Sequence, residues 1–342
     1  IHQLINSAVS QGGSQRLADW LLERRVDSSS VLWRQTLVKE LKPLFGFRNR
    51  LGLNSVLVSD NPDKRWDGEK VITWLESHTD EKSLLPILII LGLLSVINIV
   101  LFLLYSVAVL PPFWIVSFIL YAGIYYFKYR DFRDLFGEAY YLSNTLNEFR
   151  AVLVYLEKYS YRPDSRLAKL CQPFLDVRHK PSKLLRRIGL IASAASLQRN
   201  PIVWFFLNML MPWDLFFVYQ LGLFKGRLKS LLPVWLDTWY QLEALNSLAN
   251  FGYLNPDGVF PTLTDGSDND DRPVFQARDL GHPLIPDDER ICNDFSLMQM
   301  GEIVIITGSN MAGKSTFLRT LGVNLALTFS GGVVMASSFE TQ

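Results

Sequence analysis

A run of about 45 residues without a charged side chain constrains this chain more than any other feature. No Asp, Glu, Lys or Arg occurs in residues 83–127. A helix that crosses a bilayer needs about 20 apolar residues, and the arm Leu84–Leu110 is long enough. Pro111 and Pro112 then interrupt the helical pattern, which favours a turn. We therefore predict a transmembrane helix hairpin over residues 83–127.

The residues around this run predict its orientation. Lys82 precedes it, and Lys128, Arg130 and Arg133 follow it. Cationic residues near spans favour the cytoplasmic side, so both ends are expected in the cytoplasm and the Pro-Pro turn on the far side of an inner or plasma membrane. The second arm, Phe113–Phe127, is short for a span. The alternative is a buried helix pair in a soluble protein, although soluble helices normally keep a polar face.

Apolar residues elsewhere recur at three- and four-residue steps, which indicates amphipathic helices. We expect a mostly α-helical core in two parts, residues 1–82 and 128–251, separated by the hairpin. A second apolar run, Pro201–Phe224, contains Asp214. Because a charge in the centre of a span is costly, we interpret this run as a buried pair of soluble helices.

Residues 252–300 differ in composition and predict a linker with an entry segment to a C-terminal domain. They hold many of the prolines and the acidic stretch Thr264–Asp271. The spacing of these carboxylates does not fit a calcium loop, and no Glu stands at the closing position. A solvated surface loop is the better interpretation.

Residues 301–342 carry the clearest motif, because the sequence from Gly308 to Ser315 matches the phosphate-binding pattern GxxxxGK[ST]. The apolar run Ile303–Thr307 precedes it, a helical pattern follows over Phe317–Leu327, and Val333–Ala336 resembles a second strand. Strand, helix and strand in this order predict a parallel βαβ unit and the start of an α/β P-loop domain.

The motif combines residue types that bind a nucleoside triphosphate. Gly308 allows a sharp turn, and Gly313 allows the backbone to approach the phosphates. Lys314 is expected to reach the β- and γ-phosphates, and the Ser315 hydroxyl to bind Mg²⁺. The predicted ATP site comprises Gly308, Ser309, Asn310, Met311, Ala312, Gly313, Lys314, Ser315 and Thr316.

No catalytic residue is predicted within these 342 residues. Hydrolysis requires an acidic motif at the end of a later strand, whereas Asp294 and Glu302 precede the loop. The chain begins at Ile1 rather than Met, and Gln342 follows closely after the loop. We expect a fragment of a longer protein at both ends, with the acidic motif beyond Gln342.

Other polar residues allow two interpretations. His282 is either a nucleotide contact or a loop residue with a structural hydrogen bond. The basic cluster Lys180, Lys183, Arg186 and Arg187 is either a solvated helix face or a contact to a phosphate backbone. Since 34 basic residues balance 33 acidic ones, net charge gives no argument for nucleic-acid binding.

The loop and its surroundings resemble the MutS family of DNA mismatch repair ATPases. The distinguishing part is the pair Asn310-Met311 inside Thr307–Thr316, followed by Phe317-Leu318-Arg319. Leu280–Ile285 and Asn293-Asp294 resemble the family's segment that leads into its ABC-type ATPase domain. Parts of the helical region, among them Asn200-Pro201 and Trp213-Asp214, are similar to the core of the family's short, membrane-associated branch.

This resemblance implies lever-like core helices, ATP with Mg²⁺ as cofactors, and a homodimer with facing ATPase domains. It favours an ATP-dependent conformational motor or switch, membrane-anchored through residues 83–127. No mismatch-reading domain or DNA clamp is recognisable, so DNA is a weakly supported partner. Two alternatives stay open: a soluble repair ATPase that binds mismatched DNA, and an ATP-binding scaffold with little turnover.

Overall fold

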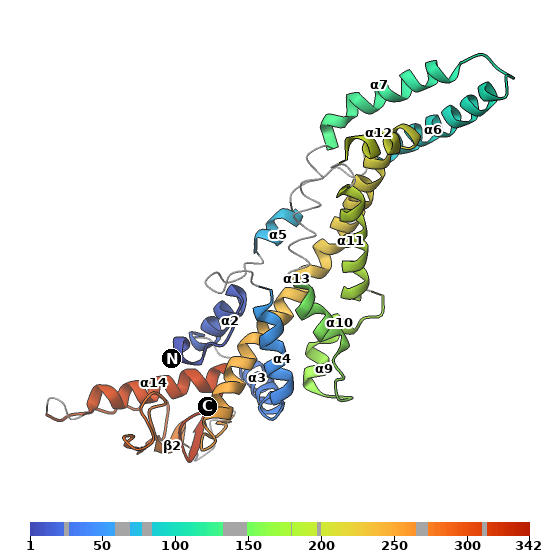
Figure 1. Ribbon diagram of the computed structural model, residues 1–342. Helices are drawn as coiled ribbons and strands as arrows, with labels where there is room; N and C mark the ends of the chain where they lie inside the picture. The colour runs from blue at the N-terminus through green and yellow to red at the C-terminus, as the bar shows by residue number, and fades with distance from the viewer. Residues whose placement is uncertain are drawn as a thin grey trace. The chain divides into compact units, whose positions relative to one another are not determined.

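A computed structural model of the chain describes nine ranges, namely residues 1–23, 27–58, 69–76, 84–132, 149–178, 180–196, 200–264, 273–309 and 313–342 (Figure 1). The described chain is mostly helical and holds one small sheet, which agrees with the expected helical core. It divides into two compact units. Unit 1 comprises Ile1–Asp67, Tyr159–Pro173 and Leu236–Gln342, and unit 2 comprises Gly68–Lys158 and Phe174–Trp235.

Unit 1 is built around the C-terminal part of the 42-residue helix α13, Trp213–Leu254. Its other helices are α1 His2–Ile5, α2 Gln11–Leu21, α3 Ser28–Leu41, α4 Phe45–Val56, α9 Arg166–Leu170 and α14 Lys314–Ser330. The α13 ring of Trp239 is fully buried and donates from its indole nitrogen to the Ser55 hydroxyl at 3.0 Å. Residues around Trp239 recur at helical spacing in the sequence, and the structure places this ring in the core of unit 1.

A buried carboxylate on α13 fixes the start of α2. Ser10 caps α2 by accepting a hydrogen bond from the Gly13 amide, and the Ser10 amide donates to Glu243 at 3.2 Å. The Val9 amide also donates to Glu243, at 3.3 Å. Burial of Glu243 raises the pKa of its carboxyl, because desolvation disfavours the charged form.

The sheet of unit 1 has four strands in the order β1-β4-β2-β3. Its strands are β1 Thr262–Leu263, β2 Phe275–Leu280, β3 Asn293–Leu297 and β4 Ser338–Thr341. β1 pairs with β4 in parallel, while β2 pairs antiparallel with both β3 and β4. The ring of Phe275 meets that of Phe339 edge-on at 5.0 Å between centroids, which gives the small sheet an aromatic centre.

Unit 2 contains two long apolar helices that pack against each other, α6 Leu84–Ser106 and α7 Trp114–Phe132. Its other elements are α5 Glu69–Glu76, the helical residues 149–158, the second half of α10 Gln172–Leu175, α11 Pro181–Ser196, α12 Pro201–Leu210 and the first part of α13. By length and composition, α6 is able to cross a membrane, while Trp114–Phe127 is a shorter apolar segment. Trp114 contacts Phe102 of α6 edge-on at 5.6 Å.

Helices α12 and α13 form a broken helix, bent by 81°. Two hydroxyl groups reach the carbonyls at the end of α12: Ser95 of α6 donates to Leu210, and Tyr121 of α7 donates to Asn208 at 2.6 Å. Beyond the break, the buried carboxylate of Asp214 accepts from Tyr125 at 2.9 Å and from Trp204 at 2.7 Å. Helices α6 and α7 thus satisfy polar groups that the break would otherwise leave bare.

The interpretation of Pro201–Phe224 as a buried pair of soluble helices is wrong for its first half. The outer side chains of α12 are exposed, namely Ile202, Val203, Phe205, Phe206 and Leu210. The prediction failed because it treated Asp214 as a charge without partners. The carboxylate is instead buried at the helix break, where Tyr125 and Trp204 donate hydrogen bonds to it.

The predicted βαβ unit is also not formed. Residues 302–309 have no secondary structure, and Ile303 and Ile305 are 86% and 80% exposed. A strand requires a neighbouring backbone to pair with, and no described segment pairs with Ile303–Thr307. Val333–Ala336 is buried and is joined to the sheet region by a bridge from Val334 to Val259 and by a hydrogen bond from the Gly281 amide to the Met335 carbonyl, but the strand itself begins at Ser338.

Gly331 ends α14 in the left-handed region, with φ of 86°. A Cβ atom there would lie 2.7 Å from Cβ of Arg34 and 2.8 Å from the amide nitrogen of Gln35. We expect Gly331→Ala to lower the free energy of unfolding by about 2 kcal/mol or more, because the left-handed conformation alone costs about 1–2 kcal/mol. Urea unfolding followed by tryptophan fluorescence measures this loss.

Gly322 is the matched control, since it lies inside the same helix and an added methyl group would meet no neighbouring side chain within 4 Å. Gly322→Ala should raise the free energy of unfolding by about 0.5–1 kcal/mol, because alanine is the better helix former. If both variants lowered the free energy of unfolding equally, the loss in Gly331→Ala would not come from the turn at Gly331.

Candidate functional site

The phosphate loop opens onto a cavity of about 510 Å³ in unit 1. Helix α14 begins at Lys314, directly after Gly313, which has a φ of 78°. Gly313 therefore makes the left-handed turn from the loop into the helix, as its place in the motif requires. The cavity is lined by His282, Ile285, Glu289, Ile291, Asn293, Asp294, Ile306, Thr307, Gly313, Lys314, Thr316, Phe317 and Thr320.

The helix start supplies groups that suit an anion. The first N–H groups of a helix have no acceptor within the helix, and the helix dipole places partial positive charge at the same end. The ring of Phe317, in the first turn of α14, meets Phe295 of β3 at 5.5 Å. This contact fixes the beginning of α14 against the sheet.

Lys314 folds back over the loop that precedes it. Its ammonium group donates to the carbonyls of Gly308 at 2.8 Å and Ser309 at 2.5 Å. These contacts hold the ammonium group at the loop. An incoming phosphate group would have to displace the two carbonyls as the ammonium group's hydrogen-bond acceptors.

The structure brings together only some of the predicted ATP-site residues. Lys314 and Thr316 line the cavity with Gly313, and Ser315 is exposed beside them. Asn310, Met311 and Ala312 lie outside the described residues, so the inner part of the loop stays a prediction.

His282 lies on the wall of the same cavity. Its Nδ1 accepts a hydrogen bond from the Leu284 amide at 3.2 Å, which is the structural contact that the sequence allowed. Burial lowers the pKa of the ring, and the positive charges of Arg319 and Arg290 lower it further. The imidazole is therefore neutral at pH 7, with Nε2 as its donor.

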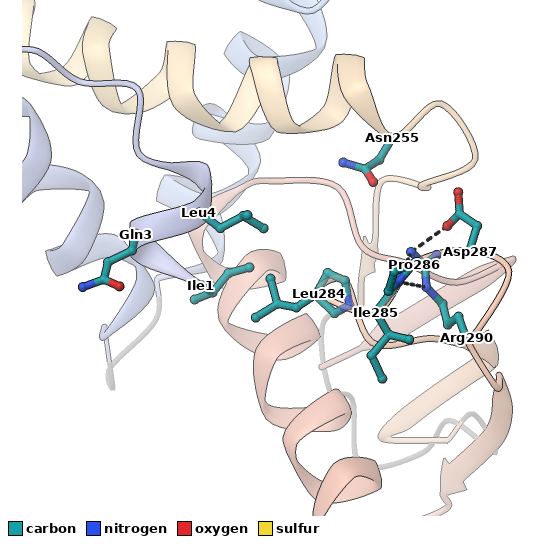
Figure 2. A pocket seen from close by; sticks show the side chains of 10 residues that line it. Ile1, Gln3, Leu4, Asn255, Leu284, Ile285, Pro286, Asp287 and Arg290 are labelled. Atoms are coloured by element: carbon teal, nitrogen blue, oxygen red, sulfur yellow. Dashed lines mark hydrogen bonds and ion pairs between the residues drawn. The ribbon is translucent and has the colours of Figure 1, made fainter.

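Arg290 shapes the segment that carries His282. Its guanidinium donates twice to the Ile285 carbonyl, at 3.2 and 2.9 Å, and pairs with Asp287 at 2.7 Å. Figure 2 shows these contacts at a neighbouring hollow of about 700 Å³, where Ile1 and Leu4 lie near Leu284. These contacts fold the segment back on itself, and Ile285 lines the cavity beside the loop.

Asn324 on α14 is a positioning residue that the motif search missed. Its side-chain amide donates to the carbonyls of Gly281 at 3.0 Å and Thr320 at 2.9 Å, and it accepts from the Met335 amide at 2.9 Å. The side chain is fully buried. Its signal in the sequence was a single amide among the apolar residues of a predicted helix.

Asp294, which we excluded from catalysis by its position, has a structural contact. Its carboxylate accepts from the Asp279 amide at 2.8 Å, and Asp279 has a φ of 50°. Asp294 therefore supports the irregular end of β2, while it also lines the cavity.

Comparison with known proteins gives partial matches to one family. The chain is 28% identical over 124 residues to the DNA mismatch repair protein MutS of Fusobacterium nucleatum, which covers 33% of this chain and 13% of that protein. It is 46% identical over 69 residues to the endonuclease MutS2 of Thermus thermophilus, covering 19% of this chain and 9% of that protein.

A third match is the DNA mismatch repair protein MutS of Leuconostoc mesenteroides, with 37% identity over 102 residues, or 29% of this chain and 11% of that protein. No protein-family model matches the chain. The chain thus spans between 9% and 13% of the length of these curated relatives. Both MutS and MutS2 proteins recur among the matches, so the matched parts of the chain are similar to the MutS family, which includes DNA mismatch repair proteins.

Proposed function

We propose that this chain binds ATP with Mg²⁺ and serves as part of a membrane-anchored, MutS-like conformational switch. The observation that carries the proposal is the start of α14: a left-handed Gly313 followed by Lys314 at the mouth of a cavity of about 510 Å³. Cavities of roughly 300–1,000 Å³ suit small ligands and cofactors.

The lining of the cavity offers groups for both parts of a nucleotide. Lys314 and the first turn of α14 supply positive charge and N–H donors for phosphates, and the exposed Ser315 hydroxyl would bind Mg²⁺. Ile285 and Ile291 supply apolar surface for a base. A neutral His282 adds a donor there without adding charge.

Contacts along α14 support a role in transmitting motion. At its far end, the Arg34 guanidinium of α3 donates to the Phe329 carbonyl at 3.1 Å. α14 also packs on α2. A shift of α14 on nucleotide binding would therefore reach α2 and α3 directly, which is what a switch requires.

We expect Lys314→Ala to weaken ATP–Mg²⁺ binding by about 10- to 100-fold, because a hydrogen bond to a charged group contributes about 1.5–3 kcal/mol. Isothermal titration calorimetry of the whole protein measures the affinity. Lys229→Ala is the control, since Lys229 is an exposed lysine of α13 in unit 2, and it should leave the affinity unchanged. Equal affinities for wild type and Lys314→Ala would overturn the nucleotide proposal.

The membrane part of the proposal rests on α6 and its neighbours. α6 has 23 residues, and only 17% of its most apolar window is buried. Soluble proteins rarely expose apolar patches larger than a few hundred Å², so this surface suits lipid. The flanking Lys82 and Lys128 support cytoplasmic ends and a far-side turn at residues 107–113.

The two cysteines provide a direct test of this topology. Cys292 is exposed and Cys171 is buried, and burial raises the pKa of the Cys171 thiol to about 12, so only Cys292 should react. In intact cells, a membrane-impermeant maleimide should label Pro112→Cys in a Cys292→Ser background and should not label native Cys292. After lysis, Cys292 should react.

Labelling of Cys292 before lysis, or recovery of the protein in the soluble fraction without detergent, would refute the anchor. The second result would favour the alternative of a soluble repair ATPase that binds mismatched DNA. Phosphate release by the whole protein separates a motor from a scaffold with little turnover. The resemblance to the MutS family implies a homodimer with facing ATPase domains, and we propose that a partner covers the exposed Ile303 and Ile305.

A further inference from the structure

A basic groove lies between α11 and the first part of α13 in unit 2. It encloses about 680 Å³ and is lined by the cationic side chains of Arg178, Lys180, Lys183, Arg186, Arg187 and Arg227. No Asp or Glu of the described residues lines it. Like charges gathered in this way repel one another, and an anionic ligand would relieve that repulsion.

The nearest carboxylates are engaged elsewhere. Glu157 accepts hydrogen bonds from the amide and the hydroxyl of Ser182, both at 2.8 Å, and Asp176 accepts from the Arg178 amide at 2.9 Å. Within the part of the chain that the structure describes, none of the six cationic side chains forms an ion pair with a carboxylate.

The groove also has an apolar wall. Val177 and Leu190 are 68% and 62% exposed, and Leu184, Phe224 and Leu231 line the same hollow. Cations beside exposed aliphatic side chains suit an amphiphile, which carries phosphate at one end and hydrocarbon at the other. A nucleic-acid backbone would use the cations but would leave this wall uncovered.

Both helices change from uncharged to basic as they lead away from the α12–α13 break. α11 is uncharged from Ile188 to Ser196, and α13 is uncharged from Leu215 to Phe224. The Trp213 indole joins the two helices at the break by donating to the Ala194 carbonyl at 3.4 Å. Figure 1 shows α11 and α13 running away from the α6–α7 pair, on the side opposite its 107–113 turn.

The spacing matches the depth of a bilayer. The break is bound by Ser95, the middle residue of α6. Arg187 lies seven residues before Ala194 on α11, and Arg227 lies thirteen residues after Asp214 on α13. At 1.5 Å per residue these steps are about 10 and 20 Å, which bracket the half-thickness of the hydrocarbon core, about 15 Å.

We propose that the α11–α13 groove binds the phosphate of an anionic phospholipid at the cytoplasmic surface of the membrane. The proposal rests on the proposed membrane anchor, because the anchor places the groove at the level of the headgroups. Basic pockets at this depth attract anionic lipids. The balanced net charge of the chain, +1, provides no wider field for a long polyanion such as DNA.

The test uses the full chain in vesicles of equal parts phosphatidylglycerol and phosphatidylcholine. After extraction in mild detergent, mass spectrometry counts the lipids that stay bound. Wild type should retain phosphatidylglycerol at least about fivefold over phosphatidylcholine. The triple variant Arg186→Gln, Arg187→Gln, Arg227→Gln should retain the two lipids about equally, while Lys229→Gln, outside the groove, should behave as wild type. Equal retention by wild type would overturn the proposal.

Two further measurements separate the possible failures. Flotation of each variant with vesicles reports the anchor itself, so a chain that floats without lipid selectivity refutes the groove alone. If wild type does not float, the membrane anchor is refuted. Binding of soluble dihexanoyl-phosphatidylglycerol then tests the groove by itself: binding by wild type that is lost in the triple variant would support it, and no binding by wild type would refute it. A duplex DNA that displaces the bound lipid, and whose binding the triple variant loses, would make the groove a nucleic-acid contact and overturn the lipid assignment.

Discussion

Unit 2 depends on hydroxyl donors that reach the backbone where α12 ends. A helix break leaves carbonyl groups without partners, and in apolar surroundings each one costs several kcal/mol. Ser95 and Tyr121 supply these donors from two different helices. Because each hydroxyl must meet one particular carbonyl, the two bonds also fix the positions of α6 and α7 along α12. Together with the hydrogen bond from Tyr125 to Asp214, these polar contacts therefore set the register of two helices that are otherwise strongly apolar.

Helices were predictable from the sequence because their signal is local. Most of the uncharged run is helical, in α6 Leu84–Ser106 and in α7 from Trp114, and the residues around Trp239 and the pattern Phe317–Leu327 are helical as well. The strand expected at Ile303–Thr307 could not be judged in the same way, since a strand depends on a distant partner. Asp214 shows a second limit, because hydropathy records a charge but not the Trp204 and Tyr125 donors that hold it.

The phosphate loop was the most predictable part of the candidate site, because its chemistry lies in consecutive residues. The sequence assigned the sharp turn to Gly308 and close approach of the backbone to Gly313, whereas the structure has a left-handed turn at Gly313, directly before α14 begins at Lys314. The wall opposite the loop was not predictable in the same detail. His282 lies more than twenty residues before Gly308 in the chain, and only the fold brings its ring to the cavity. Its pKa is lowered by burial and by the charge of Arg319, and no sequence pattern reveals either cause.

Asn324 is the residue of unit 1 whose contacts tolerate the fewest substitutions. One amide group donates to two carbonyls and accepts from one N–H. Asp would present an acceptor to both carbonyls, and Leu would leave the Gly281 carbonyl and the Met335 amide without this partner. Gln is longer by one methylene in a fully buried site. The position thus admits a single residue type, although it touches no predicted ligand. Among divergent relatives, the apolar residues of α14 should therefore vary, while this asparagine should be retained.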